Sequence, residues 1–205
     1  MSRPRIILCR HGRPALSRNV LLDWRGYEDW WRRYDEGGLR RGDGRAADAD
    51  QPVPPRVAEM ARGADAVCAS PLPRARESAR LAAGREPDHI LPDMVEAPLP
   101  PPRLPGLRVR PITWGTLSRI AWLAGHGSDC ESAREARARA RRAAAALAEL
   151  AHAEGGRTVF VSAHGWFNRM VGTALRRAGW RLASGRGDGY WSHRVFERPA
   201  SKDNP

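Results

Sequence analysis

Residues 6–12 read Ile6-Ile7-Leu8-Cys9-Arg10-His11-Gly12, and this stretch decides how the chain is expected to fold. The run of four apolar residues begins with β-branched side chains and ends at a charge and a glycine. This pattern predicts a short buried strand over residues 6–9. In an open parallel sheet, ligands bind just beyond the carboxyl ends of the strands. Arg10 and His11 are therefore expected where chemistry takes place, although a surface turn after an edge strand is the other interpretation.

Two later segments repeat this pattern of a strand followed by polar residues. Residues 64–69 (ADAVCA) predict a second strand, and the helix expected after it carries Arg74 in its first turn. Helix N-termini favour anions, and a guanidinium adds a bidentate fork that matches phosphate. Residues 158–162 (TVFVS) predict a third strand, with His164 and Gly165 beyond its end and a helix from about residue 166 to 178. His164 thus corresponds in position to His11.

Strands that alternate with helices predict an α/β fold with three layers, α/β/α, around a mostly parallel central sheet. An aromatic stripe, Trp24, Tyr27, Trp31 and Tyr34, predicts a helix that packs on the body of the domain or forms a mobile flap. A polar loop over 41–52 and helices over 54–62 and 113–125 are also expected. Ser128-Asp129-Cys130-Glu131 fits a capping box, which predicts that the longest helix runs from there to about residue 154. Residues 190–196 predict a last strand, at an edge of the sheet.

Chain length and composition favour a single domain. We expect it to span residues 1–198, with insertions at about 20–50 and 97–127 and a flexible tail at 199–205. Insertions of this kind often cover a site and set its specificity. No stretch approaches the ~18 apolar residues of a membrane span, so we expect a cytoplasmic protein without a membrane partner.

The formal net charge of +12 raises the question of nucleic-acid binding. Nearly all of the positive charge is arginine, since Lys202 is the only lysine, and the arginines are spread along the chain without a basic tail. We therefore expect no nucleic-acid partner, whereas the positive field is expected to attract anionic substrates such as phosphate esters. The three cysteines, Cys9, Cys68 and Cys130, lie far apart, which indicates neither a zinc site nor a disulfide framework.

The predicted strand ends bring together two arginines, two histidines and one carboxylate: Arg10, His11, Arg74, Glu96 and His164. One imidazole can attack phosphorus while the other cationic groups neutralise the phosphoryl oxygens. The carboxylate can protonate the leaving oxygen and later activate water. This chemistry needs no metal and no cofactor, although Glu96 as a solvated loop carboxylate stays an alternative.

These motifs resemble the histidine phosphatase superfamily, also called phosphoglycerate-mutase-like. The resemblance rests on residues 7–12 (ILCRHG), 70–79 (SPLPRARESA) and 161–165 (VSAHG), in that order. It implies that His11 is the nucleophile that becomes phosphohistidine and that Arg10, Arg74 and His164 complete the phosphate pocket. Members whose second histidine is followed by glycine, as His164 is here, usually take the general acid/base from a mid-chain glutamate, which Glu96 matches.

Some positions depart from the pattern of this superfamily. Many members have Glu-Thr or a similar pair where this chain has Arg13-Pro14, and many mutase-like members have an asparagine where Ser17 stands. These departures put a fourth phosphate ligand in doubt. The segment from Trp24 to Tyr34 and the Pro-rich stretch after Glu96 are not standard mutase features, and they argue against the glycolytic mutase activity. The sequence therefore predicts a metal-independent phosphatase for a small phosphorylated metabolite or a phosphoprotein, which also binds inorganic phosphate. The alternatives are a catalytically weak phosphate-binding module and a phosphomutase.

Overall fold

A computed structural model describes residues 3–39, 52–127, 129–153, 156–185 and 187–198. The predicted tail at 199–205 and most of the predicted loop at 41–52 lie outside these residues. The centre of the fold is a six-stranded sheet with the strand order β3-β2-β4-β1-β6-β5. The strands are β1 (Arg5–Arg10), β2 (Ala66–Ala69), β3 (His89–Ile90), β4 (Thr158–Ala163), β5 (Arg181–Ser184) and β6 (His193–Glu197).

The strands β3, β2, β4 and β1 run parallel, and β6 and β5 are antiparallel to their neighbours. In β1, Leu8 lies opposite Val161 of β4, and Arg10 lies opposite Ala163. Both strands therefore end at the same edge of the sheet, so that the residues after them meet there. The predicted α/β class with a mostly parallel sheet is confirmed.

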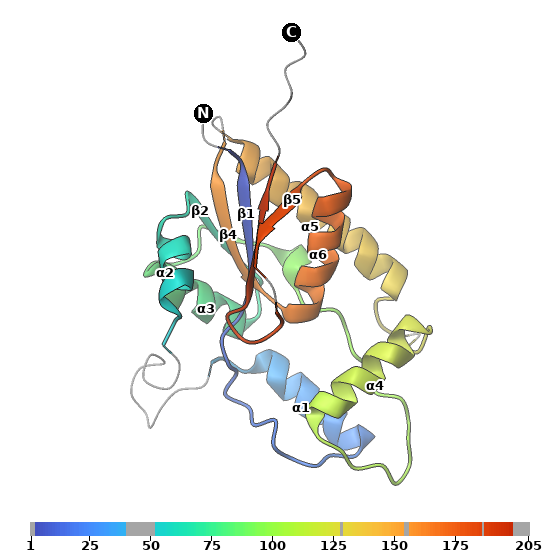
Figure 1. The fold of residues 1–205 in the computed structure, drawn as a ribbon. Helices are drawn as coiled ribbons and strands as arrows, with labels where there is room; N and C mark the ends of the chain where they lie inside the picture. Colours follow the sequence, from blue (N-terminus) through green and yellow to red (C-terminus); the bar gives the residue numbers. More distant parts are fainter. Residues whose placement is uncertain (1–2, 40–51, 128, 154–155, 186, 199–205) are drawn as a thin grey trace.

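Helices cover both faces of the sheet (Figure 1). One face packs against α2 (Pro55–Arg62) and α3 (Pro73–Ala83), and the other against α5 (Ala133–His152) and α6 (Gly165–Arg177). Each face of the sheet has its own hydrophobic core, because successive side chains of β1 point to opposite faces. Ile6 and Leu8 face α5 and α6, while Ile7 and Cys9 face α2 and α3. The short 3-10 helix η1 (Pro92–Met94) follows β3.

The two helices of the expected insertions lie together below the carboxyl edge of the parallel strands (Figure 1). They are α1 (Trp24–Glu36) and α4 (Pro111–Leu123). The ring of Tyr27 stacks on Trp114 with centroids 5.9 Å apart, and the Trp114 indole donates to the Leu22 carbonyl at 2.7 Å. The aromatic stripe thus packs against α4. Its buried members are Tyr27, Trp30 and Tyr34, so Trp30 takes the place that the sequence pattern gave to Trp31.

The predicted start of the longest helix is wrong by one turn. The N-cap of α5 is Ser132, whose hydroxyl accepts from the Glu135 amide at 3.3 Å, while the Glu135 carboxylate accepts from the Ser132 amide at 2.8 Å. The carboxylate of Glu131, which the predicted box required, is instead bound by Arg139 at 2.7 Å. The same four-residue motif occurs twice in succession, at 128–131 and at 132–135. Ser128 lies outside the described residues, and the second copy forms the capping box of α5.

The edge position predicted for the last strand is also wrong. β6 lies between β1 and β5, and β5 is the edge strand. The sequence pattern missed β5 because three of its four residues are exposed, so it has no apolar run. Pairing with β6 on one side alone is enough to hold it.

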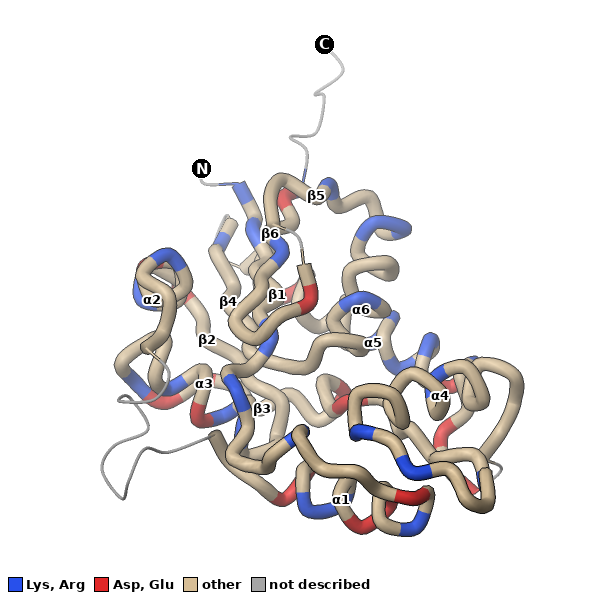
Figure 2. The backbone as a smooth tube through the Cα atoms, turned by 60° about the horizontal axis from the view of Figure 1, so that its bottom comes forward, with Lys and Arg blue, Asp and Glu red and all other residues tan. Residues whose placement is uncertain are grey.

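Charged residues are distributed over the helices of all layers, with acidic positions interspersed among the arginines (Figure 2). Within the described parts of the chain, no helix is long and apolar enough to cross a membrane.

Candidate active site

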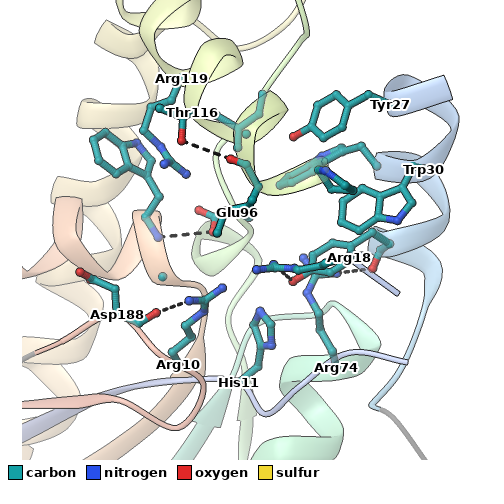
Figure 3. Close-up of a pocket in the computed structure, with 18 of the residues that line it drawn as sticks. Arg10, His11, Arg18, Tyr27, Trp30, Arg74, Glu96, Thr116, Arg119 and Asp188 are labelled. Carbon is teal, nitrogen blue, oxygen red and sulfur yellow. Dashed lines mark hydrogen bonds between the residues drawn. The ribbon is translucent and has the colours of Figure 1, made fainter. Parts of the chain in front are cut away.

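His11 and His164 meet where β1 and β4 end. Their ring centroids are 5.3 Å apart, and both side chains are buried. They lie beside a cavity of about 290 Å³ that opens between the sheet edge and the helices α1 and α4. The cavity is lined by His11, Arg10, Arg74 and Glu96 among others (Figure 3). The structure thus brings all five sequence-predicted site residues together.

The orientation of His11 is fixed by its neighbours. Its Nδ1 lies 2.6 Å from the Gly12 carbonyl oxygen, which can only accept, so Nδ1 carries the proton and Nε2 keeps its lone pair. The Gly12 amide donates to the Ser78 hydroxyl at 2.8 Å, and that hydroxyl donates to the Arg74 carbonyl at 2.7 Å. Burial, reinforced by His164 and the two nearby guanidiniums, holds the pKa of His11 well below its usual value. His11 is therefore a neutral, oriented imidazole.

His164 is held in the opposite tautomer. Its Nδ1 lies 3.4 Å from an Arg74 nitrogen that can only donate, and its Nε2 lies 2.8 Å from the Ser70 hydroxyl. Nδ1 therefore accepts, and Nε2–H donates to Ser70. Burial and the charges of Arg74 and Arg10 hold the pKa of His164 well below its usual value.

Arg74 stands in the first turn of α3, as predicted, and its side chain is fully buried. Two groups at the end of α1 hold it: the Tyr34 carbonyl accepts at 2.7 Å and the Asp35 carboxylate at 2.9 Å. The Arg74 guanidinium also lies over the Tyr34 ring, 4.5 Å from its centroid. Helix α1 is thus a wall of the site as well as a packing element.

Arg10 ends β1 and reaches into the cavity from the side opposite Arg74 (Figure 3). It donates to the main-chain carbonyl of Asp188 and lies over the Tyr190 ring, 4.8 Å from its centroid. A Cβ on Gly165 would come within 3.2 Å of the Arg10 Nε. The glycine after His164 therefore leaves room for this arginine.

Glu96 follows η1 and lies at the N-terminus of α6. Its carboxylate accepts from the amides of Phe167 at 2.9 Å, Trp166 at 3.4 Å and Ala97 at 3.1 Å. Free amides at a helix start orient a carboxylate that accepts from them. Glu96 is therefore a fixed, half-buried group in the cavity that His11 faces, and not a solvated loop carboxylate.

Several cavity residues were missed by sequence reasoning: Arg18, Tyr34, Arg119, Arg169 and Asp188. Tyr34 belonged to the predicted stripe, but only the tertiary packing of α1 shows that it also faces the site. The arginines gave no signal because arginine is common throughout this chain. In the described part of the chain, no group of three or more His, Cys, Asp or Glu residues is arranged to hold a metal ion.

Much of the chain is similar to a known protein family. Residues 53–186 match the family model described as histidine phosphatase superfamily (branch 1). The chain has no significant match among curated proteins. Mycobacterial glucosyl-3-phosphoglycerate phosphatase superposes with a TM-score of 0.57 at 18% identity, covering 95% of this chain and 90% of that one.

Two further solved structures share the fold. The product of an open reading frame of Mycobacterium tuberculosis superposes with a TM-score of 0.53 at 21% identity, covering 93% of this chain and 89% of that one. The ecdysone phosphate phosphatase of Bombix mori, in complex with tungstate, gives a TM-score of 0.53 at 14% identity, covering 99% and 96%. Since the family model covers well over half of the sequence, the chain belongs to the histidine phosphatase superfamily.

Proposed function

We propose that the protein is a metal-independent phosphatase that hydrolyses a small phosphomonoester through a phosphohistidine on His11. The observation that carries this proposal is the unprotonated Nε2 of a buried, oriented His11 beside a cavity lined by Arg10 and Arg74. Membership of the superfamily supports phosphatase chemistry. The phosphatase names of two fold relatives support it further.

In the first step, the His11 Nε2 lone pair attacks phosphorus, and the bond from phosphorus to the ester oxygen breaks. Glu96, in its protonated form, gives its proton to the departing oxygen, so that the leaving group departs as a neutral alcohol. Arg10 and Arg74 surround the transferred group, where their cationic N–H groups stabilise the charge on the phosphoryl oxygens. His164 joins them once its Nε2–H turns from Ser70 to a phosphoryl oxygen.

In the second step, a water molecule attacks the phosphohistidine. The Glu96 carboxylate takes one proton from that water while the bond from phosphorus to Nε2 breaks, which returns His11 to its neutral form and releases inorganic phosphate. His11 keeps its Nδ1 proton throughout, because the Gly12 carbonyl holds it.

Trapping the intermediate tests the role of His11. Rapid quenching of the wild type with a ³²P-labelled phosphomonoester is expected to leave acid-labile, alkali-stable label on the chain. His11→Ala is expected to lose the label and the release of phosphate, whereas His152→Ala, on the exposed end of α5, keeps both. Phosphate release by His11→Ala at the wild-type rate would contradict the proposal, and transfer to a second position of the substrate would indicate a mutase.

The leaving group tests the role of Glu96. Glu96→Gln keeps an oxygen acceptor for the amides of α6 but has no proton to give. We expect it to lower kcat/KM for an alkyl phosphate by about 10² or more, and considerably less for 4-nitrophenyl phosphate, whose leaving group departs without protonation. Equal losses for both substrates would assign Glu96 to a purely structural role.

A further inference from the structure

Arg119 differs from the other arginines that line the cavity. Each of the others donates to a polar partner. Arg10 donates to the main-chain carbonyl of Asp188, and Arg169 donates to the carboxylate of the same residue. Arg18 donates to the Tyr34 hydroxyl, and Arg74 pairs with the Asp35 carboxylate. Arg119, on α4, has no hydrogen bond or ion pair to any of the residues that the structure describes, and its Nε is out of contact with solvent. A guanidinium that is half-buried without a polar partner lacks compensation for lost hydration.

The position of Arg119 is nevertheless well defined. Its guanidinium lies over the Trp166 ring, 4.4 Å from the centroid, and reaches from α4 towards Glu96 (Figure 3). Burial lowers the pKa of Arg119, and the nearby charge of Glu96 offsets part of this effect. Glu96 itself is held by amides at the start of α6. The donors of Arg119 therefore remain available to a molecule in the cavity.

The apolar part of the cavity lining suits a compact leaving group. Apolar and aromatic side chains also line the cavity, among them Tyr27, Trp30, Leu99 and Ile112. The volume of about 290 Å³ is at the small end of the range for small-molecule sites. Flat apolar surfaces of this kind accept a short carbon skeleton and orient it by contact area.

We propose that Arg119 forms a second anion subsite, so that the preferred substrate is a small phosphomonoester whose leaving group carries an anionic group of its own. The proposal rests on the phosphatase function above. With the phosphoryl group at His11, the leaving group extends past Glu96 to the guanidinium on α4. A carboxylate and a second phosphate share the required chemistry, since both pair with the planar guanidinium fork.

Matched aryl phosphates test this subsite. Phenyl phosphate, 3-carboxyphenyl phosphate and 1,3-phenylene bisphosphate differ only in the second group. Calorimetric affinities are measured with His11→Ala, which is expected to bind substrate without turnover, and kcat/KM is measured with the wild type. We expect one or both of the probes with a second anionic group to be preferred over phenyl phosphate by about ten-fold. The stronger of the two identifies the second group as carboxylate or phosphate.

The same ratios are then measured after substitution at Arg119. Arg119→Gln is expected to bring the preference close to one, and Arg119→Lys to keep part of it, because lysine retains the charge without the fork. Arg110→Gln, at the exposed N-cap of the same helix and outside the cavity lining, removes the same charge and is expected to leave the ratios unchanged.

The two proposals fail in different ways. Equal affinity for the three probes, or a preference that survives in Arg119→Gln, overturns the second subsite even if phosphate is released. Preferential binding without any phosphate release by the wild type overturns the phosphatase function and leaves the subsite standing. The affinity measurement with His11→Ala therefore separates the two.

Discussion

Gly12 keeps His11 in place because its lack of a side chain lets the backbone after His11 pack against Trp191. A Cβ at this position would lie 2.7 Å from Cζ2 of Trp191, which is a closer approach than packed atoms tolerate. Trp191 is buried in the core between the sheet and the helices α2 and α3, so its ring has little room to move away. The Gly12 carbonyl holds the His11 proton, so any shift of residue 12 also shifts the imidazole.

We expect Gly12→Ala to lower the free energy of unfolding by about 1–3 kcal/mol, because extra atoms in a packed site force its neighbours apart. We also expect kcat to fall while KM changes little. Urea denaturation and steady-state kinetics measure the two effects. Gly189→Ala is the control, because a Cβ there meets no atom within 4 Å, and a change within about 0.5 kcal/mol is expected. If Trp191→Phe does not relieve any of the Gly12→Ala defect, the steric explanation is wrong.

The element that most affects the site is α1, whose last turn holds Arg74. Asp35 lies beside the proposed phosphate position, and its carboxylate binds the same guanidinium that the phosphate needs. Burial raises the pKa of Asp35 more than Arg74 lowers it, so the charged form is costly where it stands. The negative charge of Asp35 therefore competes with phosphate for Arg74.

Asp35→Asn removes this charge and keeps an oxygen that can accept from Arg74. We expect inorganic phosphate to bind several-fold more tightly to this variant at low ionic strength, with the difference shrinking as salt is added. Asp29→Asn is the matched control on the same helix, since Asp29 pairs with exposed arginines, and it should change the affinity little. Weaker phosphate binding in Asp35→Asn would mean that the carboxylate positions Arg74 more than it competes.

Among the helices and strands, the sequence predicted those whose position is set by a local pattern of apolar residues. The strands after which Arg10 and His164 stand are continuous apolar runs, and α3 begins at its predicted place with Arg74 turned inward. The edge strand β5 is held by pairing with β6 and has no apolar run to reveal it. The start of α5 could not be chosen from sequence either, because the choice depends on Arg139 taking Glu131.

For the whole molecule, the sequence could place residues after strands, but it could not place two insertions against each other. The stacking of Tyr27 on Trp114 brings α1 and α4 together, and this contact between distant segments forms the wall of the cavity that faces the sheet edge. Arg119 and Asp35 therefore had no signature in the sequence, whereas Arg10, His11, Arg74, Glu96 and His164 were expected together from their places after strands and do lie together.

Burying the site has a consequence for the stability of the whole molecule. The pKa values of His11 and His164 are well below 6.5 in the folded protein, mainly because of burial, and that of His193 is also lowered. Below pH 6.5, the unfolded chain takes up protons that the folded protein does not bind. The free energy of unfolding therefore falls as the pH falls, by up to about 1.4 kcal/mol per pH unit for each such histidine.

Urea denaturation between pH 5 and pH 7 measures this slope. The pKa of Asp188 is lowered to about 2, so this carboxylate changes the free energy of unfolding at more acidic pH. Between pH 5 and pH 7, the change comes mainly from the histidines. We expect His164→Gln to reduce the slope by close to one proton, because the unfolded chain then has one histidine fewer to protonate. His152→Gln, which changes an exposed histidine, is expected to leave the slope as it is. A wild-type stability that does not change over this range would show that the two buried imidazoles bind protons as readily in the folded protein as in the unfolded chain, and burial would then not be what keeps His11 neutral.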